Sequence, residues 1–287
     1  MIVKRKTFKE MMVVHTNEEL RNEVEYRLYE YGSRCNLNDI DVSSISDFSE
    51  IFKDLDFNGD ISEWDVSNGT RFDYMFCNSS FNGDISKWNM TRARNLTGMF
   101  EDSVFNGDIS KWDPIRTRYM DHMFYNSLFN GDLSKWDVSS VRNMDGMFAF
   151  SKFTGDISKW DVSRVESMNN MFHGASFNGD ISKWDVSSVE WMNRMFHGAS
   201  FNGDISKWNV SRLKWMDYMF CDSKFTGDLS KWDVRNVRGM EMVFFNSKFN
   251  GDVSTWNPEK IIHARSMFKN TELEGKEPSW YLNRKCL

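Results

Sequence analysis

The chain has 287 residues, of which 27% are charged, and a formal net charge of −6. This balance gives no global indication of nucleic-acid binding. No apolar run approaches the roughly 20 residues that cross a bilayer. Aromatic residues reach 15%, with 12 Trp and 24 Phe. Most of them recur at one fixed spacing, which indicates a core ladder rather than a binding role.

Residues 1–36 precede the repeat and predict a helical N-terminal cap. Thr16 and Glu19 stand at capping-box spacing, and Gly32 ends the pattern. Between them, one amphipathic face is formed by Leu20, Val24, Tyr26, Leu28 and Tyr31. The first ten residues include basic ones, but no apolar stretch follows, so they do not form a secretory signal.

Residues 37–268 are a partial first coil and nine full copies of a 24-residue repeat without insertion or deletion. A period held so strictly predicts a solenoid of stacked coils, because any change of length would disturb the neighbouring coils. The leading Phe of each copy is Phe57, Phe81, Phe105, Phe129, Phe153, Phe177, Phe201, Phe225 or Phe249. The Trp of each copy is Trp64, Trp88, Trp112, Trp136, Trp160, Trp184, Trp208, Trp232 or Trp256.

One copy shows what each coil is expected to contain. Apolar residues alternate from Trp184 to Val186, which predicts a short strand, whereas Val189, Met192, Met195 and Phe196 predict a helical turn. The Asn-Gly or Thr-Gly pair then reverses the chain, with glycine expected at positive φ. The predicted fold is therefore an α/β repeat solenoid, a leucine-rich-repeat-like horseshoe with short parallel strands and helical return segments. A three-sided parallel β-helix fits the same period and remains the alternative.

Two resemblances follow from these motifs. Met195-Phe196-His-Gly-Ala199 takes the place of the Ala-Phe-x-x-Cys unit of BspA-like leucine-rich repeats. Phe-Asn-Gly-Asp-Ile-Ser-Lys-Trp-Asp-Val-Ser more closely resembles the uncharacterised repeat family common in mycoplasma lipoproteins and other bacteria, and the resemblance covers residues 35–268. It implies a surface or interaction module without a known reaction. The chain lacks the lipid-attachment cysteine that surface-displayed members carry near their start.

Residues 269–287 form the expected C-terminal cap. We interpret Trp280 as out of phase with the repeat. Because a solenoid exposes its core at each end, this residue is expected to fold over the last coil as a cap. An exposed aromatic anchor for a partner is the alternative for this residue.

The four cysteines predict free thiols. Cys77 and Cys221 share one repeat position but stand six coils apart, roughly 29 Å at about 4.8 Å per coil, which is beyond disulfide reach. Cys35 and Cys286 belong to opposite ends of the chain. Unpaired thiols and the absence of a signal predict a cytoplasmic protein, with surface display left open if a signal has been removed.

His173, His197 and Cys221 occupy one repeat position in three successive coils. Zinc takes such ligands, but a line of three at about 4.8 Å spacing does not close a tetrahedron, and no fourth ligand is apparent. A column of polar residues is therefore the favoured interpretation. We expect no metal and no cofactor.

The copies differ most just after the predicted strand, where basic residues gather on one edge of the coils. We call this set the basic edge: Arg92, Arg94, Arg116, Arg118, Tyr119, Arg142, Arg164, Trp191, Arg212, Lys214, Trp215, Arg235 and Arg238. Trp191 and Trp215 fill one position in adjacent coils and are the expected exposed anchors. The alternative is a solvent-exposed flank whose positive charges are balanced by carboxylates of neighbouring loops.

The predicted function is that of a non-catalytic scaffold for protein–protein interaction. An unidentified protein with an acidic surface is expected to bind the basic edge and the adjoining concave face. Binding of nucleic acid or a small phosphorylated ligand on the same arginines is one alternative, and a purely structural or assembly role is another. The chain is not expected to be an enzyme, because no catalytic motif stands apart from the repeat.

Overall fold

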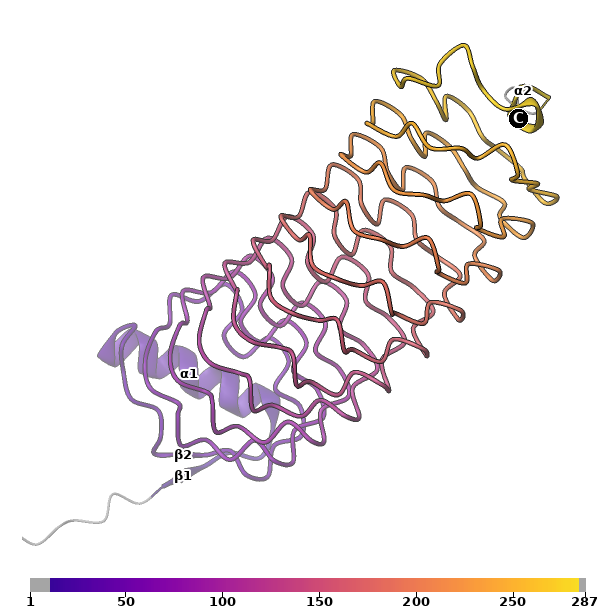
Figure 1. Cartoon of the computed structure of the whole chain (residues 1–287). Helices are drawn as coiled ribbons and strands as arrows, with labels where there is room; N and C mark the ends of the chain where they lie inside the picture. The colour runs from indigo at the N-terminus through magenta and orange to yellow at the C-terminus, as the bar shows by residue number, and fades with distance from the viewer. Residues whose placement is uncertain (1–10, 284–287) are drawn as a thin grey trace, which may run out of the picture.

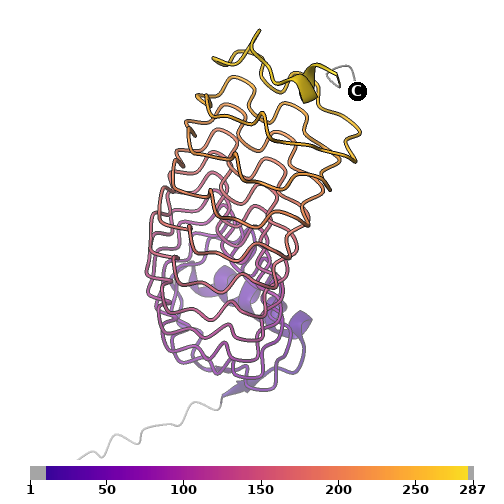
Figure 2. The same ribbon diagram turned by 45° about the vertical axis from the view of Figure 1, so that its right-hand side comes forward.

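The computed structural model describes residues 11–283, which Figure 1 shows as a stack of similar coils. Its regular elements are β1 (Met12–Val13), α1 (Asn17–Tyr31), β2 (Ile40–Asp41) and α2 (Ser279–Leu282). β1 and β2 pair in parallel. All four elements lie at the two ends of the stack, and Figure 2 shows the coils between them still stacked in the same order after a turn of 45°. Neither helix is long and apolar enough to cross a bilayer.

Backbone hydrogen bonds join each coil to the next. The N–H of Phe148 donates to the carbonyl of Met171 at 3.0 Å, and the N–H of Phe172 donates to the carbonyl of Met195 at 3.0 Å, each 23 residues further along. Parallel bridges link residues 24 apart, among them Ser167 with Trp191. The period of the sequence is thus the period of the stack, which makes the chain a repeat protein.

The segments between the end elements are built from turns rather than from the expected strands and helices. Within residues 42–278 the structure has isolated bridges but neither a helix nor a strand. The N–H of Phe196 donates forward to Met219 at 2.9 Å, in place of a bond back within a helix. Arg194 and Gly198 have φ values of 56° and 61°, and a left-handed residue at every fourth position ends any right-handed helix. Consecutive turns therefore produce the spacing of three and four that we interpreted as helical.

The Asn-Gly pairs also differ from expectation. Gly179 lacks the positive φ that was predicted for it, since the positive-φ glycines are a different set. The ring of Phe177 covers its α-carbon, and a Cβ added there would lie 2.8 Å from that ring. Glycine is needed at this position for close packing, not for a left-handed turn.

Columns of stacked aromatic rings form the core. The rings of Phe172 and Phe196 lie 5.8 Å apart, and those of Trp160 and Trp184 lie 6.5 Å apart with an angle of 3° between their planes. These side chains are buried. Offset stacks of this kind add to the free energy of apolar burial, so the predicted core ladder is confirmed.

Helix α1 caps the first coil. The N–H of Glu19 donates to the hydroxyl of Thr16 at 3.1 Å, and Gly32 ends the helix with a φ of 81°. Leu20 and Val24 are buried against the coils. The predicted cap is present, although the Tyr26 and Tyr31 side chains of the expected apolar face are exposed.

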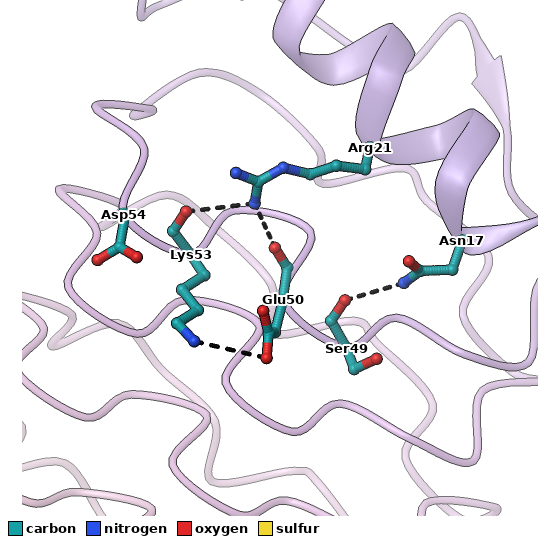
Figure 3. A pocket seen from close by; sticks show the side chains of 6 residues that line it. All are labelled: Asn17, Arg21, Ser49, Glu50, Lys53 and Asp54. Atoms are coloured by element: carbon teal, nitrogen blue, oxygen red, sulfur yellow. Dashed lines mark hydrogen bonds and ion pairs between the residues drawn. The ribbon is translucent and has the colours of Figure 1, made fainter.

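Polar side chains of α1 also satisfy the open backbone edge of the first coil. Asn17 donates to the carbonyls of Asp47 and Ser49, at 3.2 and 2.8 Å. Figure 3 shows Arg21 reaching the carbonyls of Glu50 and Lys53, and it also donates to that of Ile51. In the middle of the stack the carbonyls at the positions of Asp47, Ser49, Ile51 and Lys53 accept from the preceding coil, so α1 replaces a missing coil for these four.

The C-terminal tail continues the repeat further than expected. Trp280 follows Trp256 by 24 residues, its ring lies 6.1 Å from that of Trp256, and its indole N–H donates to the carbonyl of Val253 at 2.8 Å. It is only 8% exposed, so the alternative of an exposed anchor is wrong. Tyr281 closes the last coil, with its hydroxyl accepting from the N–H of Met267 at 3.2 Å.

Candidate binding surface

The basic edge follows a turn that each coil makes after its Trp. In one copy the N–H of Val165 donates to the carbonyl of Val162 at 2.9 Å and closes this turn. The next residue then bonds directly to the coil before it: Arg118 donates to Arg94 at 3.0 Å, and Arg142 donates to Arg118 at 2.9 Å. These backbone bonds place the same repeat position of successive coils in one column. We call it the arginine column where it holds Arg94, Arg118 and Arg142.

The charge of this column changes sign along the stack. Its three arginines are followed by Glu166 and Glu190, and then by Lys214 and Arg238. A parallel column two residues earlier holds Arg92, Arg116, Ser140, Arg164, Ser188 and Arg212. The coils around Arg118 therefore carry arginines in both columns without an acid between them.

These side chains line a shallow depression of about 290 Å³, which we call the arginine depression. Its lining residues are Arg94, Arg116, Arg118, Ser140, Arg142 and Arg164. Arg142 forms an ion pair with Glu166 at the border of the depression. Within the part of the chain that the structure describes, the other four guanidinium groups have no carboxylate within ion-pair distance. The arrangement is a concentrated, largely uncompensated positive charge.

Three of the other basic side chains of the edge, Arg212, Lys214 and Arg235, pair with carboxylates of the protein itself. Glu190 accepts from Arg212 at 3.1 Å and from Lys214 at 2.5 Å. Its hydrogen bond with Lys214 is the main cause that lowers the pKa of Glu190. Arg235 pairs with Asp233 at 2.8 Å, and Arg92 donates to the side chain of Asn68 at 2.6 Å. The predicted site is therefore uneven. Most of its unpaired guanidinium groups lie around the arginine depression, although Arg92 and Arg238 also have no carboxylate within ion-pair distance among the described residues.

The two tryptophans that we expected as exposed anchors are half-buried. Trp191 and Trp215 face each other in the column of parallel bridges. The ammonium group of Lys214 lies 5.7 Å from the ring of Trp191, and the ring of Trp215 lies 5.7 Å from that of His263. Tyr119 occupies the same column beside the arginine depression and is 47% exposed. It is the more accessible aromatic side chain of the set.

Our predictions from the sequence did not separate the paired arginines from the unpaired ones. Each copy taken alone shows one or two basic residues, and the copies must be compared position by position to find which of these residues has an acid in the neighbouring coil. The signal was present in the column positions of Glu166 and Glu190, because both interrupt the run of arginines. The described thiols behave as predicted: Cys35, Cys77 and Cys221 are free. Cys286 lies outside the described residues.

Comparison with known proteins identifies the family. A model of a Mycoplasma protein family of unknown function, DUF285, matches residues 25–128, 119–224, 149–246 and 200–284. This confirms the second resemblance, whereas kinship with BspA-like leucine-rich repeats stays a prediction. No curated protein and no solved structure matches the chain. Because the matches together extend over most of the chain, this protein belongs to the DUF285 family.

Proposed function

We propose that this repeat protein is a non-catalytic scaffold that binds an acidic protein partner at the arginine depression. The observation that carries the proposal is the group of five arginines that shares one carboxylate, Glu166. The same column holds Thr70, Glu190 and Ile262 in other coils, so the stack itself does not require arginine there. Neighbouring like charges repel one another, and a bound anionic surface supplies the missing counter-charge.

The edge is suited to a protein partner in a second respect. Tyr119 presents an exposed aromatic ring next to the arginines, and Tyr and Arg are the side chains that dominate protein interfaces. Trp191 and Trp215 remain part of the proposed surface, but as its half-buried border. The free thiols support a reducing compartment, and we propose a cytoplasmic location on that ground.

A small phosphorylated ligand is the second candidate. A depression of about 290 Å³ lined by guanidinium groups has the right size and charge for phosphate groups, which arginine binds through paired hydrogen bonds. Nucleic acid would use the same charges. Its affinity would fall steeply with salt, with a logarithmic slope proportional to the number of phosphates contacted.

The test compares two double variants that lose the same charge. Arg116→Gln/Arg118→Gln removes two arginines of the depression, whereas Lys111→Gln/Lys135→Gln removes two exposed lysines elsewhere on the coils. Both variants and the wild type are used to capture proteins from host lysate at several salt concentrations. Capture lost in the first variant and retained in the second supports the proposal, whereas equal capture by both contradicts it.

Competition with inorganic pyrophosphate separates the candidates. If the isolated protein binds pyrophosphate through the same arginines and no captured protein depends on them, the small phosphorylated ligand replaces the protein partner. A steep salt slope with a captured nucleic acid would support the nucleic-acid alternative. A structural role would be favoured if neither the wild type nor the variants captured a protein and the isolated protein did not bind pyrophosphate.

A further inference from the structure

A second cluster of chemically reactive side chains lies further along the stack, on another segment of the coils. His173, His197 and Cys221 follow the buried Phe of three successive coils, and the structure adds Asp222 to them. One ligand atom from each of His197, Cys221 and Asp222 lies within 4.8 Å of the other two. Asp222 Oδ2 is 3.2 Å from His197 Nε2 and 3.3 Å from Cys221 Sγ.

The backbone of Asp222 explains why this residue joins the group. It has a φ of 55°, in the left-handed region, and the next coil fixes its carboxylate: Asn246 donates to Oδ1 at 2.5 Å. Oδ2 is thereby turned toward the histidine and the thiol. The sequence showed only a line of three residues, and Asp222 supplies a ligand that does not belong to that repeat position.

The nitrogen of His197 that faces the other two side chains is Nε2, which lies 3.2 Å from Asp222 Oδ2. Two ligand atoms that are each about 2.0–2.3 Å from one tetrahedral zinc ion lie about 3.3–3.5 Å apart, so Nε2, Oδ2 and the Cys221 sulfur have the spacing of ligands of one ion. The other nitrogen, Nδ1, is buried and has no hydrogen-bond partner among the described residues.

We propose that His197, Cys221 and Asp222 form a binding site for one divalent transition-metal ion of the zinc type. Nitrogen, sulfur and carboxylate oxygen are the donor set that zinc uses, and the three come from two neighbouring coils. The ring of His173 stacks on that of His197, with the centroids 4.5 Å apart. A water molecule completes the coordination.

Metal binding requires the thiol of Cys221 to lose its proton, because the thiolate is the form that binds a metal. On binding, the S–H bond breaks, the sulfur–metal bond forms, and the proton passes to solvent.

The repeat provides a matched control. Cys77 occupies the position of Cys221 in a coil without histidines, and it is not part of a metal-ligand group in the described chain. The repeat also provides a mild substitution. Ala149 occupies the repeat position of Cys221 in another coil and is fully buried. The stack therefore already accommodates an alanine at the position that Cys221→Ala changes.

The experiment titrates the full chain, without a polyhistidine tag and freed of metal by a chelator, with Co²⁺ and then Zn²⁺. We expect one equivalent to bind, with a thiolate-to-cobalt absorption band and about one proton released per ion. Cys221→Ala should abolish the band, and His197→Gln and Asp222→Asn should each weaken binding about tenfold or more. Cys77→Ala should leave the absorption band and the metal affinity unchanged. Circular dichroism should show that each variant is folded.

Several results would overturn the proposal. These are the absence of a thiolate band in the wild type, a band that persists in Cys221→Ala, or a band lost in Cys77→Ala instead. Binding without proton release would also contradict coordination by Cys221. Should His197→Gln fail to fold, the pair of cysteine variants still decides the outcome.

Discussion

The indole nitrogen of Trp160 donates a hydrogen bond to the carbonyl oxygen of Leu133, 3.0 Å away and 27 residues earlier. The same bond recurs along the stack, from Trp64 to Leu37 at one end and from Trp280 to Val253 at the other. Each Trp therefore fills the core of its own coil and satisfies a carbonyl of the preceding one. Each Trp thus contributes ring burial and a second donor to a carbonyl that also accepts from its own coil, as that of Leu133 does from the N–H of Trp136.

Trp160→Ala should lower the free energy of unfolding by about 3–5 kcal/mol, because it removes a large buried ring. Trp160→Phe keeps most of the packing but leaves the Leu133 carbonyl with the N–H of Trp136 as its remaining donor, so it should cost about 0.5–1.5 kcal/mol, the net value of one hydrogen bond. Urea denaturation followed by far-UV circular dichroism measures both. Lys159→Ala alters an exposed neighbour and should stay within about 0.5 kcal/mol of the wild type. If Trp160→Ala behaved like this control, the Trp column would not carry the core.

Arg21→Ala should open the N-terminal coil more readily than the middle of the stack. The guanidinium donates to the carbonyls of Glu50, Ile51 and Lys53. In the variant the carbonyls of Ile51 and Lys53 lose their donor, whereas that of Glu50 keeps the N–H of Lys53. We expect a local loss of about 1–2 kcal/mol, measured as faster amide hydrogen exchange in the first coil. Glu25→Gln is the control, because it removes only the surface ion pair with Arg21. Equal exchange in both variants would mean that Arg21 does not act as a cap.

The repeat, its coil length, its buried aromatic columns and the N-terminal cap could be predicted from the sequence, because apolar period and capping residues act locally. The secondary structure inside a coil could not. Met192, Met195 and Phe196 have helical spacing, but the N–H groups of Met192 and Phe196 donate to the next coil, and that of Met195 closes a turn onto Met192. Consecutive turns therefore bury the same side chains as a helix would. Periodicity reports which residues face the core and does not report where the backbone hydrogen bonds go.

The candidate sites, like the fold, could be predicted only in part from the sequence. The basic residues could be placed on one edge, because they share repeat positions. Their neutralisation by Glu190, and the half-burial of Trp191 and Trp215, depend on contacts between coils. Asp222 was missed because it lies outside the column of His197 and Cys221, and only its left-handed backbone turns it toward them.

Met242→Gly should stabilise the protein slightly or leave it unchanged, which is unusual for a half-buried methionine. Met242 has a φ of 51°, and Gly98 and Gly146 hold the same repeat position with φ values of 57° and 61°. Relief of the left-handed strain, about 1–2 kcal/mol, exceeds or balances the entropic cost of glycine, about 0.5–1 kcal/mol. Glu241→Gly, next to it and without positive φ, should destabilise by about 1 kcal/mol. Urea denaturation of the two variants compares them, and a larger loss for Met242→Gly would refute the strain argument.

Acid should weaken the stack through the aspartates of its Gly-Asp turns. The backbone N–H of Ser158 donates to Asp156 at 2.9 Å and lowers the pKa of this carboxyl, and the same bond recurs from Ser62 to Ser254. A depressed folded-state pKa stabilises the native protein above the unfolded value of about 3.9, and this stability is lost as the pH falls through the lower folded value. Asp156→Asn, which keeps an oxygen acceptor, should therefore reduce the loss of stability between neutral and acidic pH.

Asp145 provides the opposite sign within the same molecule. Burial raises the pKa of its carboxyl, so ionisation opposes folding and its contribution improves as the pH falls. Asp145→Asn should consequently raise stability at neutral pH relative to acid, whereas Asp156→Asn should lower it. Urea denaturation of both variants from pH 7 down to about pH 3, spanning the unfolded value, measures the two slopes. Slopes of equal sign would show that hydrogen bonding and burial do not control these carboxyls as the structure implies.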